Sequence, residues 1–322
     1  MNVLVTGGAG YIGGIVVPIL LVEGHSVRVM DNLLHGGKSL LSVWSHQRFE
    51  FVRGDIRDQD LVRKALTGID AVVHLAAIVG DPACAREPEL ADSVNREASL
   101  FLLSHSREAG VLRFVFASTC SNYGISEGGN DLVDETTALD PVSHYAETKV
   151  AVERAILETG GDQNPGATVL RFATIFGVAP RLRLDLMVNE FTVKMIANKH
   201  LVVFGRDTWR PYIHVVDAAR AIGVILATPL HYVRGQVFNV GSTAQNYQKQ
   251  QIVQMIRPYA PNANVEYLDR GRDLRNYRVC FAKVVDSLGF QCYHSVEDGI
   301  REFAHLVETG IVEDYANPEF HN

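Results

Sequence analysis

Short apolar runs alternate with longer segments of helical periodicity through the first half of the chain. The apolar runs begin at Val3, Val27, Phe49, Ala71 and Phe114, and they are rich in β-branched or aromatic residues. Such alternation is typical of strands that form a parallel sheet with helices on both faces. The pattern predicts an α/β fold built on a doubly wound parallel sheet.

Two further strand-like runs, 167–172 and 236–240, continue the pattern past the midpoint. The domain that holds the sheet therefore does not end at a single linker. We expect it to cover 1–170, with a return of the chain at about 201–240. Segments rich in Arg, Asn, Tyr and Pro break the rhythm and predict a smaller C-terminal substrate-binding lobe from 171–200 and 241–322.

Composition excludes several classes of protein. The 30 basic and 37 acidic residues give a net charge of −7 without long runs, which speaks against nucleic acid as a main partner. The apolar stretch Ile15–Val22 contains Pro18 and is far shorter than the roughly 20 residues that span a bilayer. We expect no membrane contact.

The four cysteines form no CxxC pair and no secretory leader is visible, so reduced thiols and a cytoplasmic location are expected. The twelve histidines show no HExxH or HxH spacing, so no metal is expected.

A glycine-rich loop follows the first strand directly and precedes an apolar helical run. Its sequence, from Thr6 to Gly13, satisfies both GxxGxxG and GxGxxG. Glycines permit a tight turn and let backbone amides approach a pyrophosphate at a helix N-terminus, as in the Rossmann fold. Asp31 ends the second strand, where a carboxylate accepts hydrogen bonds from a ribose diol and repels a 2′-phosphate. The sequence predicts a Rossmann domain that binds NAD rather than NADP.

Tyr145 and Lys149 lie four residues apart on a predicted helix that begins after Pro141. A phenol titrates near pH 10, and a nearby ammonium favours the phenolate, which can then remove a proton from a hydroxyl. Ser118 and Thr119 end a strand upstream. Together with the glycine loop, these residues predict an NAD-dependent active site.

These motifs resemble an extended short-chain dehydrogenase/reductase of the nucleotide-sugar epimerase/dehydratase family, along essentially the whole chain. Further motifs that carry the resemblance are Gly54-Asp55-Ile56, His74-Leu75-Ala76-Ala77, Tyr123-Gly124, Leu170-Arg171-Phe172, Phe176-Gly177 and the segment from Arg210 to Asp217. The resemblance implies that Tyr145 is the acid/base at the sugar 4-hydroxyl, that Lys149 anchors the ribose and tunes the tyrosine, and that Thr119 hydrogen-bonds the reacting oxygen. NAD accepts the C4 hydride and a 4-keto sugar results.

The resemblance also implies the binding residues. Those expected to contact the cofactor are Gly7, Gly10, Tyr11, Ile12, Gly13, Asp31, Asn32, Asp55, Ile56, Leu75, Ala76, Ala77, Asn95, Ser118, Tyr145 and Lys149. The nucleotide-diphosphate sugar is expected to contact Asn189, Arg210 and Arg270 as well as Thr119 and Tyr145. In this family the Tyr/Lys helix pairs with the helix near 94–109 of a second subunit, which implies a homodimer.

The chain departs from the family pattern at positions that decide the reaction. The 4,6-dehydratases carry Asp and Glu after the active-site threonine, whereas Cys120 and Ser121 stand here, so standard dehydration lacks its acid and base. Cys120 is a candidate acid/base, with core packing as the alternative. The segment from 181 to 191 resembles a branch that includes GDP-heptose 4-dehydrogenases.

Several alternatives remain open on the sequence. The leading interpretation is a nucleotide-sugar epimerase acting through C4 oxidation; the alternatives are a 4-dehydrogenase that releases the keto sugar, a 5- or 3,5-epimerase using Cys120 or His144, and a non-catalytic NAD sensor. Segment 79–84 either shapes the sugar pocket or forms a structural turn. The basic residues Arg181, Arg183, Arg272 and Arg275 are either solvated or in contact with ligand.

Overall fold

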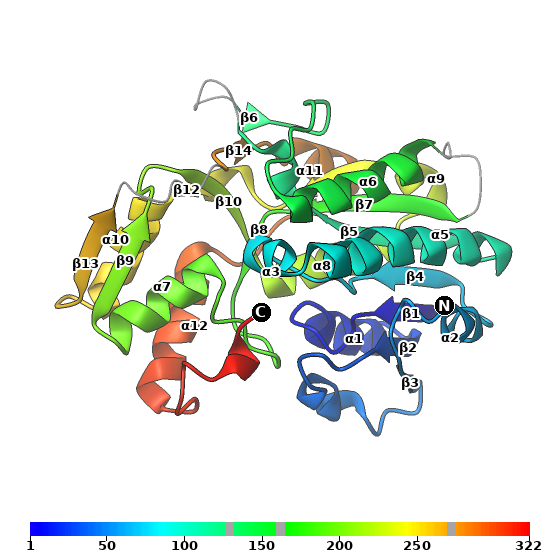
Figure 1. Ribbon diagram of the computed structural model, residues 1–322, viewed down its shortest axis with the longest axis horizontal. Coiled ribbons are helices and arrows are strands. Elements are labelled where there is room, and N and C mark those ends of the chain that lie inside the picture. The colour runs from blue at the N-terminus through cyan, green and yellow to red at the C-terminus, as the bar shows by residue number, and fades with distance from the viewer. Residues whose placement is uncertain (126–131, 159–164, 269–274) are drawn as a thin grey trace.

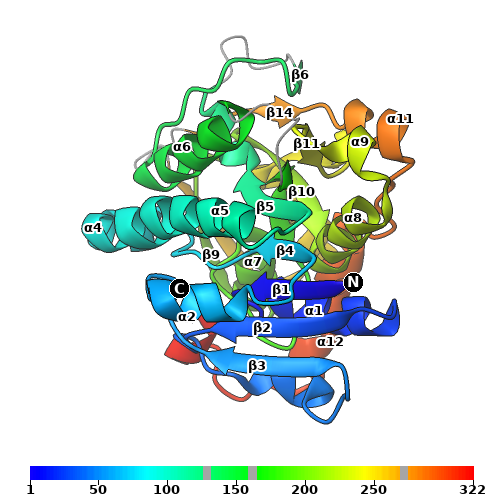
Figure 2. The same ribbon diagram turned by 90° about the vertical axis from the view of Figure 1, so that its right-hand side faces the viewer.

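The computed structural model describes residues 1–125, 132–158, 165–268 and 275–322. Its larger part is built on a parallel sheet with the strand order β3-β2-β1-β4-β5-β7-β11 (Figures 1 and 2). The strands are β1 (Asn2–Thr6), β2 (Ser26–Asp31), β3 (Phe49–Arg53), β4 (Ala71–His74), β5 (Arg113–Thr119), β7 (Gly166–Phe172) and β11 (Val237–Val240). The order reverses between β1 and β4, which is the switch point of a doubly wound sheet. The predicted fold class is confirmed.

Helices cover both faces of this sheet, because successive side chains of a strand point to opposite faces. Val3 and Val5 of β1 belong to the core that α1 and α8 cover, whereas Leu4 belongs to the core under α2, α5 and α6. The helices are α1 (Gly13–Val22), α2 (Gln59–Ala65), α3 (Asp81–Arg86), α4 (Pro88–Ala91), α5 (Ala98–Glu108), α6 (His144–Glu158), α8 (Val215–Ala227), α9 (Leu230–Val233) and α11 (Ala282–Leu288). Burial on both faces accounts for the continuous apolar runs of the sequence.

A smaller lobe is built from later segments of the chain. In it, β10 pairs with β8 in parallel and with β12 in antiparallel orientation, and β9 pairs with β13. Its elements are β8 (Thr174–Phe176), α7 (Met187–Ile196), β9 (His200–Phe204), β10 (Trp209–His214), β12 (Asn246–Gln248), α10 (Lys249–Ile256), β13 (Asn264–Leu268) and α12 (Val296–Thr309). A separate core around Phe176, Tyr212 and Ile300 holds this lobe together. A short pair of strands, β6 (Leu132–Val133) and β14 (Arg278–Val279), joins its last part to the larger one.

The chain returns to the larger part at α8, later than the expected return near residue 201. The reason is strand pairing: β9 and β10 find their partners among the strands of the smaller lobe. From α8 onward the chain packs on α1 and then adds β11 beside β7. The return segment of the sheet domain is therefore 215–240.

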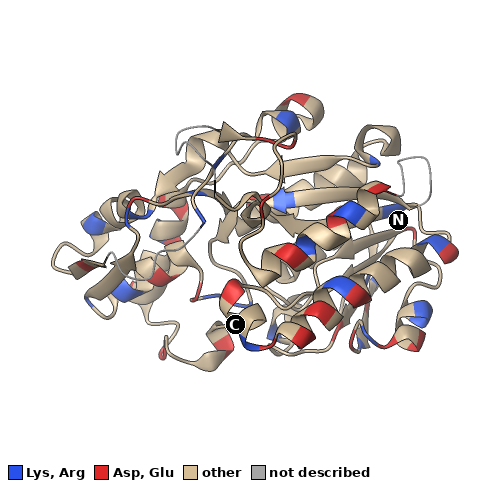
Figure 3. Cartoon of the chain, turned by 45° about the horizontal axis from the view of Figure 1, so that its top comes forward, with Lys and Arg blue, Asp and Glu red and all other residues tan. Residues whose placement is uncertain are grey.

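Acidic and basic residues are mixed along the helices on the face seen in Figure 3, rather than gathered by sign. Among the residues described, no helix is long and apolar enough to cross a membrane. Nor does this part of the chain hold a group of three or more His, Cys, Asp or Glu side chains placed to bind a metal ion.

A buried ion pair fixes α6 to the sheet. Glu153 of α6 and Arg171 of β7 are 1% and 4% exposed, and Arg171 Nη2 lies 2.7 Å from Glu153 Oε2. The other carboxylate oxygen accepts hydrogen bonds from Ser118 Oγ and from Asn122 Nδ2. Because Ser118 is the second-last residue of β5, the pair ties the helix that carries Tyr145 and Lys149 to two adjacent strands.

Replacing one partner leaves the other charge buried without compensation, which typically costs about 3–5 kcal/mol. We expect Glu153→Ala to lower the free energy of unfolding by this amount in urea denaturation. Glu147→Ala, on an exposed position of the same helix, should change it by less than about 1 kcal/mol. Equal effects of the two substitutions would contradict the role given to the pair.

Candidate functional site

One cavity of about 400 Å³ lies at the carboxyl ends of the central strands, between the sheet and the smaller lobe. Ligands bind at this edge in open α/β sheets. Most of the residues that the sequence predicts for the site line it. These are Gly7, Gly10, Tyr11, Ile12, Gly13, Asp31, Asn32, Asp55, Ile56, Leu75, Ala76, Ala77, Ser118, Thr119, Tyr145 and Lys149. The predicted cofactor end and the predicted catalytic end therefore belong to one continuous space.

The glycine loop is a cradle that larger residues would fill. Gly7 has a φ of 72°, in the left-handed region, and a Cβ on it would lie 2.6 Å from the backbone nitrogen of Ala76. A Cβ on Gly13 would lie 2.6 Å from the carbonyl oxygen of Gly7. These glycines keep strand β1, helix α1 and the segment after β4 close together and leave backbone free to face a phosphate.

Asp31 connects the end of β2 to this loop. Its carboxylate accepts hydrogen bonds from the backbone nitrogens of Ala9, at 2.9 Å, and Leu33, at 2.8 Å. Burial nevertheless raises the pKa of Asp31 above its ordinary value. The carboxylate lines the cavity with acceptor capacity left, since each of its oxygens carries two lone pairs. This is the arrangement expected for a ribose diol.

A second acidic group lies beside it, after β3. Asp55 accepts two hydrogen bonds from the Arg57 guanidinium, each 2.9 Å long, and one from Asn32. These contacts, chiefly those from Arg57, lower the pKa of Asp55 to about 2. Asp55 is therefore a fixed negative charge at the part of the wall predicted to contact the cofactor.

Tyr145, Lys149 and Thr119 line the other end of the cavity. Lys149 is 3% exposed, its Nζ donates to the Ala117 carbonyl at 3.0 Å, and it lies 5.9 Å from the centre of the Tyr145 ring. Burial lowers the pKa of Lys149 to about 8. Thr119 Oγ1 accepts from the Ser121 nitrogen at 3.1 Å, so its hydroxyl proton is available for another partner.

The tyrosine departs from the simple sequence expectation. Burial raises the pKa of the Tyr145 phenol well above its ordinary value, and the Asp81 carboxylate acts in the same direction. The charges that lower this pKa are Arg183 and Arg275. Arginines of the smaller lobe thus complement the ammonium of Lys149 at this end of the cavity.

Three predicted contact residues lie behind the cavity wall instead of on it. Asn95 is fully buried and holds the backbone of Ile78 through both its amide oxygen and its amide nitrogen. Asn189 is fully buried too, and Arg210 donates from Nη1 to the carbonyls of Trp209 and Arg275. In the structure these residues hold backbone segments that line the cavity. Arg270, which is also predicted to contact the nucleotide sugar, lies outside the described residues.

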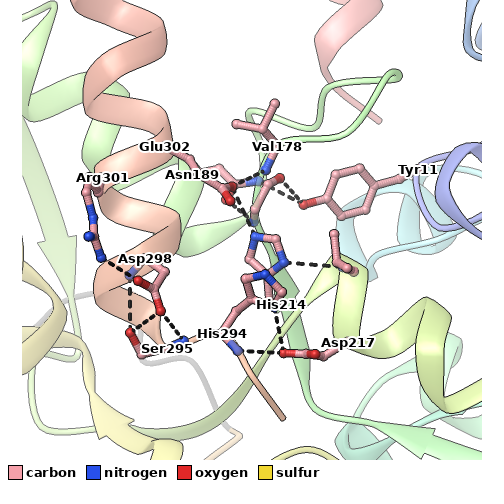
Figure 4. A network of polar contacts seen from close by, with 12 residues as sticks. Tyr11, Val178, Asn189, His214, Asp217, His294, Ser295, Asp298, Arg301 and Glu302 are labelled. Atoms are coloured by element: carbon pink, nitrogen blue, oxygen red, sulfur yellow. Dashed lines mark hydrogen bonds and ion pairs between the residues drawn. The ribbon is translucent and has the colours of Figure 1, made fainter.

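Asn189 belongs to a network that joins the glycine loop to the smaller lobe (Figure 4). Its Nδ2 donates to Tyr11 Oη at 3.3 Å, and Tyr11 Oη donates to the Gly177 carbonyl at 2.5 Å. One residue on, the Val178 nitrogen donates to Glu302 of α12, which also pairs with His214 at 3.0 Å. The loop between β8 and α7 is therefore anchored at its start from both lobes.

The candidate acid/base Cys120 does not reach the cavity. It is 1% exposed, and its Sγ donates to the Arg171 carbonyl at 3.2 Å. Burial raises the pKa of the Cys120 thiol well above its ordinary value. His144 also lies off the cavity wall and is 3.5 Å from Asp92. The geometry supports packing as the role of Cys120.

Several wall residues have two possible roles on the sequence or carry no sequence signal. Val79, Gly80 and Asp81, from the segment left open between turn and pocket, line the cavity, as do Arg181, Arg183 and Arg275. Asp81 accepts from Ser143 Oγ at 2.8 Å and pairs with Arg275 at 2.9 Å. Tyr277 and Asn322 also line the cavity and carry no motif that a single sequence reveals.

Comparison with known proteins agrees with this geometry. The chain is 30% identical over 275 residues to the UDP-glucose 4-epimerase of Corynebacterium glutamicum, covering 80% of each chain. The structure of the Thermus thermophilus UDP-glucose 4-epimerase in complex with NAD is similar to this one, with a TM-score of 0.83 and 27% sequence identity. The match covers 97% of this chain and 100% of that one. The dTDP-glucose 4,6-dehydratase of Streptomyces venezuelae, solved with NAD bound, gives a TM-score of 0.84, with 28% identity over 96% and 98% of the chains.

These named relatives correct one detail of the sequence analysis. They are UDP-glucose epimerases and dTDP-glucose dehydratases, so the resemblance of segment 181–191 to GDP-heptose 4-dehydrogenases is not supported. The profile described as "NAD dependent epimerase/dehydratase family" matches residues 3–241. NAD is the cofactor of this family and of its structural neighbours. The chain belongs to the NAD-dependent epimerase/dehydratase family.

Proposed function

We propose that this chain is an NAD-dependent nucleotide-sugar epimerase that oxidises the sugar at C4 to a 4-keto sugar and then reduces it on the opposite face. The observation that carries the proposal is that Tyr145, Lys149 and Thr119 line the same cavity as the glycine loop and Asp31. The named epimerase relatives support the same reaction class.

The cavity fits NAD. The glycine loop offers a cradle in which an added Cβ would clash, and Asp31 offers carboxylate oxygens for the adenosine ribose. When bound, NAD supplies an acceptor for the C4 hydride. The other roles belong to side chains of the protein.

Tyr145 is proposed to take the proton of the C4 hydroxyl, and Thr119 to donate a hydrogen bond to the same oxygen. Lys149 holds its ammonium near the tyrosine ring, and the positive charges of Arg183 and Arg275 favour the phenolate. The Ser118 hydroxyl is turned to Glu153, so it acts by fixing the end of β5. Proton removal and oxygen positioning thus come from two different elements, α6 and β5.

The positions after Thr119 argue against dehydration. A 4,6-dehydration needs an acid for the leaving hydroxyl and a base for C5, whereas Cys120 is buried and Ser121 carries only a hydroxyl. The placement of Cys120 and His144 off the cavity wall also weighs against epimerisation at C5. The remaining catalytic alternative is a 4-dehydrogenase, which releases the keto sugar.

A panel of UDP-, dTDP-, GDP- and CDP-sugars incubated with the protein and NAD tests the proposal. Absorbance at 340 nm and product NMR are followed together. A new sugar isomer without net NADH supports the epimerase. Continuing NADH formation with a 4-keto product would establish the dehydrogenase instead.

Substrate contacts are proposed to come from Arg275 and Tyr277, with Arg210 behind them. The Arg210 guanidinium lies 5.2 Å from the centre of the Tyr277 ring and donates to the Arg275 carbonyl. Arg210 would then position the segment that touches the nucleotide diphosphate. We propose a positioning role for Asn189 as well, through its bonds to Gly177 and Tyr11.

Replacing Tyr145 by Phe removes the proposed acid/base and keeps the ring. We expect turnover to fall by about 10²–10⁴-fold, the usual contribution of a general acid/base. NAD affinity, measured by calorimetry, should stay within about twofold. Unchanged turnover would contradict the catalytic role and would favour an NAD sensor, which has no use for the phenol.

The charge of Asp81 adds to burial in raising the pKa of Tyr145 and so contributes to the pH dependence. Its carboxylate raises the pKa of Tyr145, so Asp81→Asn should lower that pKa and move the acid limb of the kcat/KM profile to lower pH. The amide keeps the shape of the side chain. Asp60→Asn, an exposed position on α2, serves as the control and should leave the profile in place. A shift to higher pH would refute this account.

We also propose a homodimer formed through α5 and α6, which pack side by side in the structure. The proposal extends the family resemblance to this chain. Leu157 of α6 is 40% exposed and offers apolar surface for such contact. Sedimentation equilibrium at micromolar concentration should give twice the monomer mass; a monomer there would contradict the proposal.

A further inference from the structure

Two buried arginines line the cavity on the loop between β8 and α7. Arg181 and Arg183 are only 7% and 6% exposed, although arginines are rarely buried without a paired charge. They are placed by an anchored loop, since the Arg183 carbonyl accepts from Asn189 and the loop start is held by Tyr11 and Glu302 (Figure 4). Their position is therefore fixed by the fold.

The positive charge of this pair is only partly compensated. Arg183 donates to Asp185 from Nε, at 2.8 Å, and from Nη2. Arg181 has no carboxylate partner among the described residues: its Nη2 donates to Asn322 Oδ1 at 2.5 Å and to the His321 carbonyl at 3.4 Å. Its Nε is buried and has no hydrogen-bond partner within that part of the chain. Arg181 thus keeps a buried Nε donor without a partner at the cavity wall, and the Asp185 carboxylate, which already pairs with Arg183, acts on its charge only from a distance.

Burial and the charges of the two arginines shift the pKa values of Arg181 and His35. Burial, and then the charge of Arg183, lower the pKa of Arg181 to about 10. Burial and the two arginines lower the pKa of His35 to about 4, so this cavity residue is neutral at pH 7. Two close cations that share a single carboxylate, Asp185, are costly to bury unless a further anion joins them.

The charges of the two arginines act at both ends of the cavity. Arg183 acts electrostatically on Tyr11 of the glycine loop and on Tyr145 at the catalytic end. Arg181 acts electrostatically on His35, which belongs to the loop after β2. The anion that fits is one that spans this region, and planar guanidinium forks suit the paired oxygens of a diphosphate.

We infer that Arg181 and Arg183 form a diphosphate-binding pair, opposite the glycine loop, that closes the cavity over the phosphates of a bound nucleotide. Two ligands could supply this group, the cofactor NAD or the nucleotide sugar; the second rests on the proposed function. Asn322 currently satisfies one donor of Arg181 and would share it with the phosphate oxygens.

Binding measurements on the full chain test this inference without using turnover. Arg181→Gln removes the charge and keeps some of the bulk, Arg181→Lys keeps the charge and loses the fork, and Arg301→Gln changes a 64% exposed arginine as the control. The probes are NAD, ADP-ribose and adenosine in one arm, and UDP, dTDP and uridine in the other. Circular dichroism and thermal melting establish that each variant is folded.

We expect Arg181→Gln to weaken the diphosphate ligands of one arm about tenfold, as the loss of charged hydrogen bonds implies. The nucleosides should change by less than twofold, and Arg181→Lys should lie between. Loss for NAD and ADP-ribose assigns the pair to the cofactor; loss for UDP or dTDP assigns it to the substrate. Unchanged affinity in both arms, or an equal loss for the nucleosides, would overturn the inference. A failure of the proposed epimerase reaction would leave the cofactor arm intact.

Discussion

The site depends on a buried charge beneath it. Glu153 of α6 meets Arg171 of β7 in the interior, and its second oxygen gathers Ser118 and Asn122 from the end of β5 and the turn after it. A buried ion pair is costly unless hydrogen bonds satisfy it, and here the carboxylate is fully engaged. The result is one fixed orientation of α6. Tyr145 and Lys149, on the first turns of that helix, therefore line the same cavity as Thr119 at the end of the neighbouring strand.

A second constraint acts between the two lobes. Tyr11 stands in the glycine loop, yet its hydroxyl is bound to the smaller lobe through Gly177 and Asn189. Glu302 of α12 holds Val178, the residue after Gly177, at the start of the loop between β8 and α7. The cavity wall that carries the arginine pair is thus tied to the loop expected to cradle the cofactor phosphates. This linkage gives a physical reason for one continuous cavity in place of two separate sites.

Much of the fold and the cofactor end could be predicted from the sequence, because local rules decide them. Val3 and Leu4 lie in a continuous apolar run, as expected for a strand that is buried on both faces of the sheet. At Gly7 and Gly13 an added Cβ would clash with neighbouring backbone. Asp31 follows from its place at the end of a strand. These features depend on neighbours in the sequence, which a motif describes.

The remaining parts depend on contacts between distant segments. A motif shows that an asparagine stands at 95 or 189, but not that its amide faces backbone instead of ligand. Strand partners decided that β9 and β10 join the smaller lobe. Tyr277 and Asn322 reach the cavity through the packing of late segments, for which the local sequence carries no signal.

The central claim is that hydride leaves C4 of the sugar and returns to the same carbon. A nucleotide sugar labelled with deuterium at C4, followed by NMR, tests it most directly with the substrate found in the panel. The account predicts a product inverted at C4 that keeps the deuterium on C4, with slower turnover than the unlabelled sugar. Inversion with loss of the deuterium to solvent, or turnover that leaves the C4–deuterium bond untouched at full rate, would contradict it.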